Sequence, residues 1–147
     1  MKIFFLILTI VSSFSLFARA NNVANFEIDE INLLAKKNNV KLIGNIKRGK
    51  KIFSSRKVNC LSCHEAPIKE EKFHGNFGPS LYRVGSVYSK DEIRLRVINA
   101  KIINSNSIMP AYYVKINNPR TPKNFLNKTI LSAQEVEDLV EYLYSLK

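Results

Sequence analysis

Both cysteines of this 147-residue chain lie in one short stretch, Cys60-Leu61-Ser62-Cys63-His64. Two cysteines separated by two residues and followed at once by histidine form C-x-x-C-H, a pattern typical of covalent attachment of a c-type haem. Thiols at this spacing can each add to a vinyl group of one porphyrin, and the adjacent histidine then lies beside the iron. We therefore predict thioether bonds at Cys60 and Cys63 and an axial iron ligand at His64.

The residues leave three other uses of these cysteines open. A thioredoxin-like C-x-x-C is expected in a βαβ context and needs no histidine. A zinc site would use Cys60, Cys63, His64 and His74, although four ligands in one stretch with no second pair are unusual. A structural disulfide would close a very small loop. An export signal and a helix predicted before the motif favour haem.

The second axial ligand is expected to be Met109. Outside the first twenty residues it is the only methionine, and the only histidine besides His64 is His74. Met109 is followed by Pro110, in a loop that can return across the opposite haem face. A Met/His pair raises the reduction potential, which suits an electron acceptor.

Three further residues are predicted to line the haem pocket: Pro79, Leu81 and Tyr112. Pro79 and Leu81 belong to a Gly-Pro-Ser-Leu turn that we expect on the His64 side of the haem. The Pro79 carbonyl can accept the Nδ1 proton of His64 and so fix the orientation of the imidazole. Tyr112 and Tyr113 follow the methionine closely, and a surface role in partner contact suits them equally well.

Residues 1–20 are predicted to be a cleaved signal peptide. Met1-Lys2 is a positive start, an apolar run follows, and Ala18-Arg19-Ala20 is a cleavage signal. Serine and threonine interrupt the run, which is therefore too weak for a typical transmembrane helix. An uncleaved membrane anchor remains the alternative. We expect an exported, periplasmic chain that starts near Asn21 and has no later membrane span.

The exported part is predicted to contain an extension and one domain. Residues 21–42 are polar, and we expect a loose N-terminal extension with a short helix near residues 30–37. Residues 43–147 suffice for one compact domain. No alternating strand pattern is evident, so the predicted fold is mostly α, with long loops that need something to pack around.

Three helices are predicted in the domain. The first spans about residues 45–54, and its Gly49 costs about 1 kcal/mol relative to alanine, which predicts close approach of another backbone. The other two begin at capping boxes, Ser89 to Glu92 and Ser132 to Glu135. In the second helix, Arg94 and Arg96 are expected on a solvated face, with a haem propionate as the alternative contact. The third carries an apolar stripe: Val136, Leu139, Val140 and Leu143.

The chain is strongly basic, with 23 Lys and Arg against 12 Asp and Glu and a formal charge of +11. The 46% content of hydrophobic residues excludes a disordered chain. Outside the cytosol such a charge does not indicate nucleic acid; it indicates an acidic protein partner or solubility. The basic cluster within residues 47–57 is either a docking patch or a solvated helix face.

These features together resemble the class I cytochromes c. They are Gly49 with Phe53, the C-x-x-C-H motif, Gly78 to Leu81, Met109-Pro110, and the C-terminal helix with Tyr142. Within that family, residues 108–113 and 128–140 closely resemble SoxX subunits. The resemblance covers residues 43–147. It implies the class I cytochrome c fold, in which helices pack around one covalently bound haem.

The resemblance also implies a function. SoxX subunits form a heterodimer with SoxA, a second c-type cytochrome, and the complex is an L-cysteine S-thiosulfotransferase. It couples thiosulfate oxidatively to a cysteine of the SoxYZ carrier, and SoxX passes the electrons to a soluble cytochrome or oxidase. No catalytic residue is expected on this chain itself. The alternatives are a free-standing periplasmic monohaem electron shuttle and, in a different class, a zinc-binding structural module.

Overall fold

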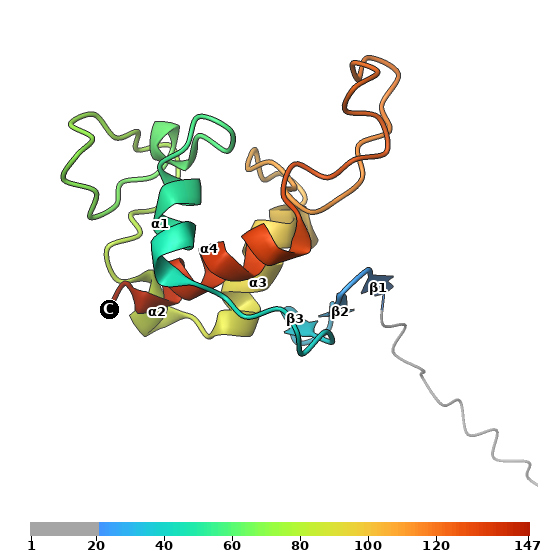
Figure 1. Ribbon diagram of the computed structural model, residues 1–147, viewed down its shortest axis with the longest axis horizontal. Coiled ribbons are helices and arrows are strands. Elements are labelled where there is room, and N and C mark those ends of the chain that lie inside the picture. The colour runs from blue at the N-terminus through green and yellow to red at the C-terminus, as the bar shows by residue number, and fades with distance from the viewer. Residues whose placement is uncertain (1–20) are drawn as a thin grey trace, which may run out of the picture.

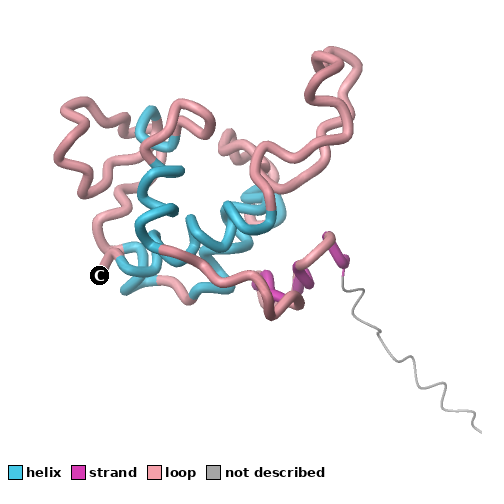
Figure 2. The backbone as a smooth tube through the Cα atoms, in the orientation of Figure 1, coloured by secondary structure: helices cyan, strands magenta, loops and turns pink. Residues whose placement is uncertain are grey.

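The computed structural model describes residues 21–147, so the predicted signal peptide lies outside the described residues. Three main helices, α1 (Ile46–Phe53), α3 (Lys90–Asn99) and α4 (Ala133–Ser145), form the centre of the molecule (Figure 1). Three shorter helical segments connect them: η1 (Cys60–Ser62), α2 (Val84–Val87) and η2 (Ala100–Ile102). Long loops make up much of the remainder (Figure 2). Within residues 21–147, no helix has the length and apolar character needed to cross a membrane.

Helices α1 and α4 pack at very close range through Gly49. A Cβ atom at this position would lie 2.0 Å from the Asp138 carbonyl oxygen and 2.6 Å from Cβ of Tyr142. Next to this contact, the rings of Phe53 and Tyr142 lie 5.5 Å apart. The predicted close backbone approach is confirmed, because only glycine lets the two helices meet there.

A buried carboxylate joins the start of α1 to α4. Asp138 accepts a hydrogen bond from the Asn45 backbone N–H at 2.9 Å, and Arg48 donates to both of its oxygens. The side chain of Asn45 caps α1 by accepting from the backbone N–H of Arg48. The Asp138 charge is therefore both paired and hydrogen-bonded, as a buried carboxylate requires.

The two predicted capping boxes are present at α3 and α4. Ser89 and Glu92 bond reciprocally at the start of α3, and Ser132 and Glu135 do so at the start of α4. Hydrogen bonds from Ser89 lower the pKa of Glu92. Helix α3 packs against α4 and also against the N-terminal sheet. Because α3 is covered on two sides, it has no clear polar face of the kind found on surface helices.

The N-terminal region departs from the prediction. Residues 21–37 form a three-stranded antiparallel sheet: β1 (Asn21–Val23), β2 (Phe26–Asp29) and β3 (Leu34–Lys37). The short helix expected near residues 30–37 is wrong. Apolar Phe26 and Ile28 alternate with polar neighbours along β2, a four-residue pattern that is easily overlooked. The Asp29 carboxylate then accepts from the backbone of the next turn and reverses the chain.

This sheet is firmly attached to the helices, so the expectation of a loose extension is also wrong. The Tyr113 hydroxyl donates to the Ala24 carbonyl at 2.9 Å and accepts from the Asn25 side chain at 3.1 Å. The Phe26 ring meets the Tyr113 ring edge-on at 5.1 Å. The side chains of Phe26 and Ile28 are thereby removed from water and extend the hydrophobic core.

The position of Arg94 contradicts both expectations for it, a solvated helix face and contact with a haem propionate. Its side chain is buried between the sheet and α4, where it donates to both Glu137 oxygens, at 2.5 and 3.1 Å. It also donates to the Ala35 carbonyl at 2.7 Å and pairs with Asp91. Its neighbour Arg96 is half-buried, with its guanidinium 3.8 Å from the centre of the Tyr88 ring. Arg94 is therefore neither solvated nor free to bind a propionate.

Candidate haem site

The two cysteines and the histidine are presented by one tight turn. Helix η1 follows Asn59, which has a left-handed backbone with φ of 53°, and the backbone N–H groups of Cys63 and His64 both donate to the Cys60 carbonyl. Cys60 is buried, whereas Cys63 and His64 are half-buried. Asparagine is one of the few residues that tolerate this conformation, so Asn59 suits its place before the motif.

The His64 ring is held by the turn at residues 78–81. Its Nδ1 lies 2.8 Å from the Pro79 carbonyl oxygen, so the predicted contact is present. A carbonyl only accepts, which assigns the proton to Nδ1 and leaves the Nε2 lone pair free for a metal. Gly78 lies against the imidazole: a Cβ there would be 2.3 Å from Cε1 of His64. The Gly78 N–H donates to the Cys63 carbonyl at 2.7 Å, which ties the turn to the motif.

The surroundings of the two cysteines and of His74 bear on the disulfide and zinc interpretations of the motif. No disulfide joins Cys60 and Cys63, and burial raises the pKa of the Cys60 thiol to about 12. Within residues 21–147, no three His, Cys, Asp or Glu side chains are arranged to hold a metal ion. His74 instead accepts a hydrogen bond from the Ala66 backbone at 3.3 Å. The zinc interpretation therefore finds no support.

Tyr112 connects the two halves of the site. Its hydroxyl donates to the Val58 carbonyl at 2.9 Å, and the phenol lies beside the Cys60 thiol. Burial raises the pKa of Tyr112, so it remains a neutral donor. Tyr112 and Tyr113 are 5% and 7% exposed, which excludes the surface role that the sequence had left open for them.

Met109 lies on a segment whose position is set by α3. The backbone N–H groups of Tyr112 and Tyr113 donate to the carbonyls of Val97 and Ile98 at the end of that helix. The Met109 side chain is half-buried and packs against the core, as does Leu81. In Figure 1 the segment after α3 and the segment after α1 extend from the same side of the helices. Tyr112 thus brings the methionine segment to the cysteine motif.

These residues fit a haem c. Two thiols stand at the required spacing, His64 offers Nε2, and the thioether of Met109 belongs to a segment bound to the same turn. This is the set of donors that c-type cytochromes use. The turn that contains Gly78 was expected beside His64, but the direct contact of Gly78 with the imidazole and the role of the Val58 carbonyl were not. Only the packing reveals them, because a backbone carbonyl has no signature in the sequence.

Comparison with known proteins identifies the family of the chain. The family model of cytochrome c matches residues 46–147. No curated protein sequence matches the chain. The crystal structure of SoxXA from P. pantotrophus is similar, with a TM-score of 0.68 and 28% identity, over 78% of this chain and 90% of that one. This match confirms the resemblance to SoxX and the class I cytochrome c fold. The chain therefore belongs to the cytochrome c family, whose members carry covalent haem c and transfer electrons.

Proposed function

We propose that this chain is the electron-accepting haem subunit of a SoxAX-type complex in the periplasm. The observation that carries the proposal is the structural match to SoxXA, which extends over 90% of the matched chain. The match supports pairing with a SoxA-type cytochrome. The predicted signal peptide supports export to the periplasm.

In this proposal Cys60 and Cys63 would hold the haem through thioethers, and His64 and Met109 would bind its iron. Once bound, the haem supplies reversible one-electron chemistry at iron. The chain supplies the surroundings: the Pro79 carbonyl holds the His64 proton on Nδ1, and Tyr112 and Leu81 exclude water from the pocket. None of these side chains acts as an acid, base or nucleophile, so bond formation is left to the partner.

The proposed overall reaction is the oxidative joining of thiosulfate to a carrier cysteine. The carrier thiol and thiosulfate form a new S–S bond, and the thiol proton and two electrons are released. The product is a cysteine S-thiosulfonate on a SoxYZ-type carrier. This subunit takes up the electrons one at a time and passes them to a soluble cytochrome or oxidase.

Purification of the red protein from the periplasm, followed by subunit analysis and a reduction assay, tests the proposal. We expect a second c-type cytochrome to co-elute in a 1:1 complex. Thiosulfate is expected to produce the reduced haem spectrum only when that partner and the carrier are both present. A single haem protein with the mass of the mature chain, unaffected by thiosulfate under all these conditions, would instead establish the free-standing electron shuttle.

A substitution at Gly78 tests the placement of His64. In the haem-loaded protein, Gly78→Ala is expected to displace the imidazole, because the new methyl group overlaps the ring. Overpacking of this kind costs about 1–3 kcal/mol. We expect a lower melting temperature together with a loss of part of the low-spin visible spectrum. Ser80→Ala, on the exposed side of the same turn, is the matched control and is expected to change neither. A native spectrum for Gly78→Ala would show that His64 is not held there.

A further inference from the structure

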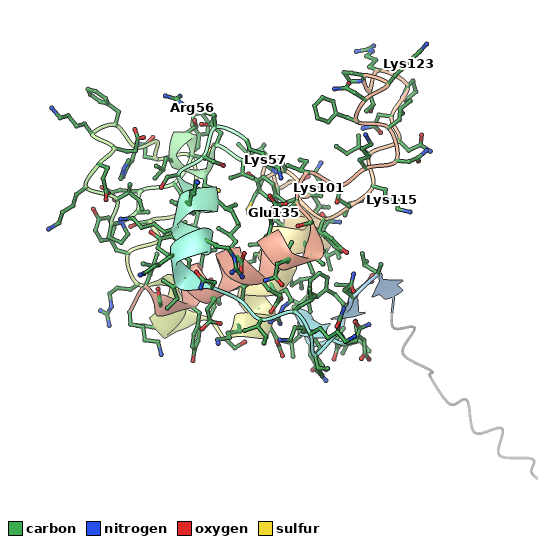
Figure 3. All side chains as sticks on the ribbon, in the orientation of Figure 1. Arg56, Lys57, Lys101, Lys115, Lys123 and Glu135 are labelled. Carbon is green, nitrogen blue, oxygen red and sulfur yellow. The ribbon has the colours of Figure 1, made fainter. Side chains whose placement is uncertain are left out.

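Tyr112 and Tyr113 attach the segment that carries Met109 to the body of the molecule. Tyr112 bonds to the Val58 carbonyl beside the cysteine motif, and Tyr113 bonds to the N-terminal sheet. Beyond these two residues the chain turns outward, and Figure 3 shows Lys115 at the base of the extended loop. The position of the methionine therefore depends on contacts made within a few residues of it.

The side chain of Tyr113 contacts three consecutive residues of the N-terminal region. Its hydroxyl donates to the Ala24 carbonyl and accepts from Nδ2 of Asn25, and its ring packs edge-on against Phe26. The Phe26 side chain is fully buried and Tyr113 is almost so. Hydrogen bonds in such surroundings are stronger than those exposed to water. Tyr113 therefore forms a firm connection between the sheet and the methionine segment.

Asn25 is held in place by hydrogen bonds of its own. Its backbone is left-handed, with φ of 72°, a conformation that asparagine tolerates better than most residues. Its side-chain oxygen accepts from Nδ2 of Asn39 at 3.0 Å, and its carbonyl accepts from the Asn38 N–H at 3.2 Å. These bonds orient the amide with its nitrogen toward Tyr113. The turn between β1 and β2 is thus a preformed site for the tyrosine hydroxyl.

The sheet is also anchored to the helix that supports the methionine segment. The Ala35 carbonyl of β3 accepts from Arg94 of α3 at 2.7 Å. At the end of the same helix, the Ile98 carbonyl accepts from the Tyr113 N–H at 3.2 Å. Tyr113 is therefore held on α3 by its backbone and, by its side chain, on a sheet attached to that helix. Such a closed arrangement resists movement of the chain at Met109, four residues away.

We propose that the N-terminal sheet braces the axial methionine, and that Tyr113 is the positioning residue through which it acts. The inference rests on the proposed ligation of iron by Met109 and assigns a role to residues 21–37. Groups that orient a metal ligand without touching the metal commonly change metal affinity or activity by about 10–100-fold. Here the brace keeps the sixth iron position closed to outside ligands, which reserves the haem for electron transfer.

The test uses the haem-loaded protein in the ferric state and imidazole, which binds the iron only after Met109 has left it. Tyr113→Phe keeps the buried ring and removes the hydroxyl, so two hydrogen bonds are lost with little change in packing. We expect imidazole to bind about tenfold faster to this variant. The weak red absorption band by which ferric haem reports a methionine–iron bond is expected to lose intensity.

A second variant removes the partner of the tyrosine hydroxyl. Asn25→Gly deletes the amide, while glycine readily adopts the left-handed backbone that this turn requires. Because the bond to the Ala24 carbonyl remains, imidazole is expected to bind faster than in the wild type but more slowly than in Tyr113→Phe.

Two controls separate the brace from general effects. Tyr144→Phe removes a hydroxyl near the end of α4, where the ring lies against Lys90 and Lys147, and is expected to bind imidazole at the wild-type rate. Phe53→Leu loosens the contact between α1 and α4, where the ring packs against Tyr142. This variant is expected to have a lower unfolding temperature but an unchanged imidazole rate.

Three results would contradict these expectations. Wild-type imidazole rates in both Tyr113→Phe and Asn25→Gly would overturn the brace. An acceleration in Phe53→Leu as large as that in Tyr113→Phe would also overturn it, because loss of overall stability would then explain the effect. Absence of the methionine–iron band from the wild-type protein would instead overturn the ligation by Met109 on which the proposed function relies. The brace fails alone when that band is present and the rates do not change.

Discussion

Replacement of Met109 by leucine is expected to leave the haem covalently attached while lowering its reduction potential by on the order of 0.1 V. Axial ligands set haem potentials over a range of about 0.8 V, and the methionine thioether favours the ferrous state. Leucine retains the bulk of the half-buried side chain but has no sulfur, so the packing is preserved while the ligand is lost. Redox titration monitored in the visible spectrum measures the change.

The same variant is expected to bind added cyanide or imidazole rapidly, because the sixth position is open. Met109→His is a second comparison, and should restore six-coordinate iron at a lower potential than wild type. Ile108→Ala, an exposed neighbour on the same segment, is the matched control and should leave both properties unchanged. An unchanged potential in Met109→Leu would show that another residue binds the iron.

Replacement of Arg94 by methionine is expected to destabilise the protein by about 3–5 kcal/mol, because it leaves the Glu137 carboxylate buried without its main partner. The Arg94 and Glu137 side chains are only 4% and 6% exposed, and one guanidinium serves Glu137, Asp91 and the Ala35 carbonyl of β3. Lys37 lies 4.0 Å from Glu137, too far to replace two direct hydrogen bonds. Thermal unfolding of the haem-loaded protein is expected to shift downward by roughly 10 °C or more.

A double variant separates the buried charge from simple loss of packing. Arg94→Met with Glu137→Gln removes the unpaired carboxylate and should recover a large part of the lost stability. Arg96→Met removes a neighbouring arginine that stacks on Tyr88, and is expected to cost only about 1 kcal/mol or less. If Arg94→Met and Arg96→Met had the same unfolding temperature, the hydrogen bonds of Arg94 would have no special role in stability.

The parts of the fold that could be predicted depend on signals close together in the sequence. The capping boxes at Ser89 and Ser132 mark the starts of α3 and α4, because each box is a pair of hydrogen bonds between residues three apart. Gly49 indicated a close helix contact, since glycine in a helix interior has a cost that packing must offset. The three-stranded sheet was missed because its strands are only three or four residues long.

The chemistry of the site was similarly local. C-x-x-C-H places two thiols and an imidazole on one turn, so the attachment of haem follows from five consecutive residues. The hydrogen bond between His64 and Pro79, fifteen residues apart, was also foreseeable, because the Gly-Pro-Ser-Leu turn follows the motif closely in the sequence. By contrast, the Tyr112 bond to Val58 joins residues 54 apart and became evident only from the packed structure.

The cofactor, the three main helices and the excess of positive charge could all be inferred from the sequence, which also predicts the residues that attach the haem. Which cations are paired with acids, and what Arg94 does, became evident only from the folded structure. Both depend on partners distant in the chain: Arg94 meets Glu137, 43 residues away, and Lys57 meets Glu135, 78 residues away. The pairing of charges is set by which helix faces come together, and the packing of α1, α3, α4 and the sheet supplies that information.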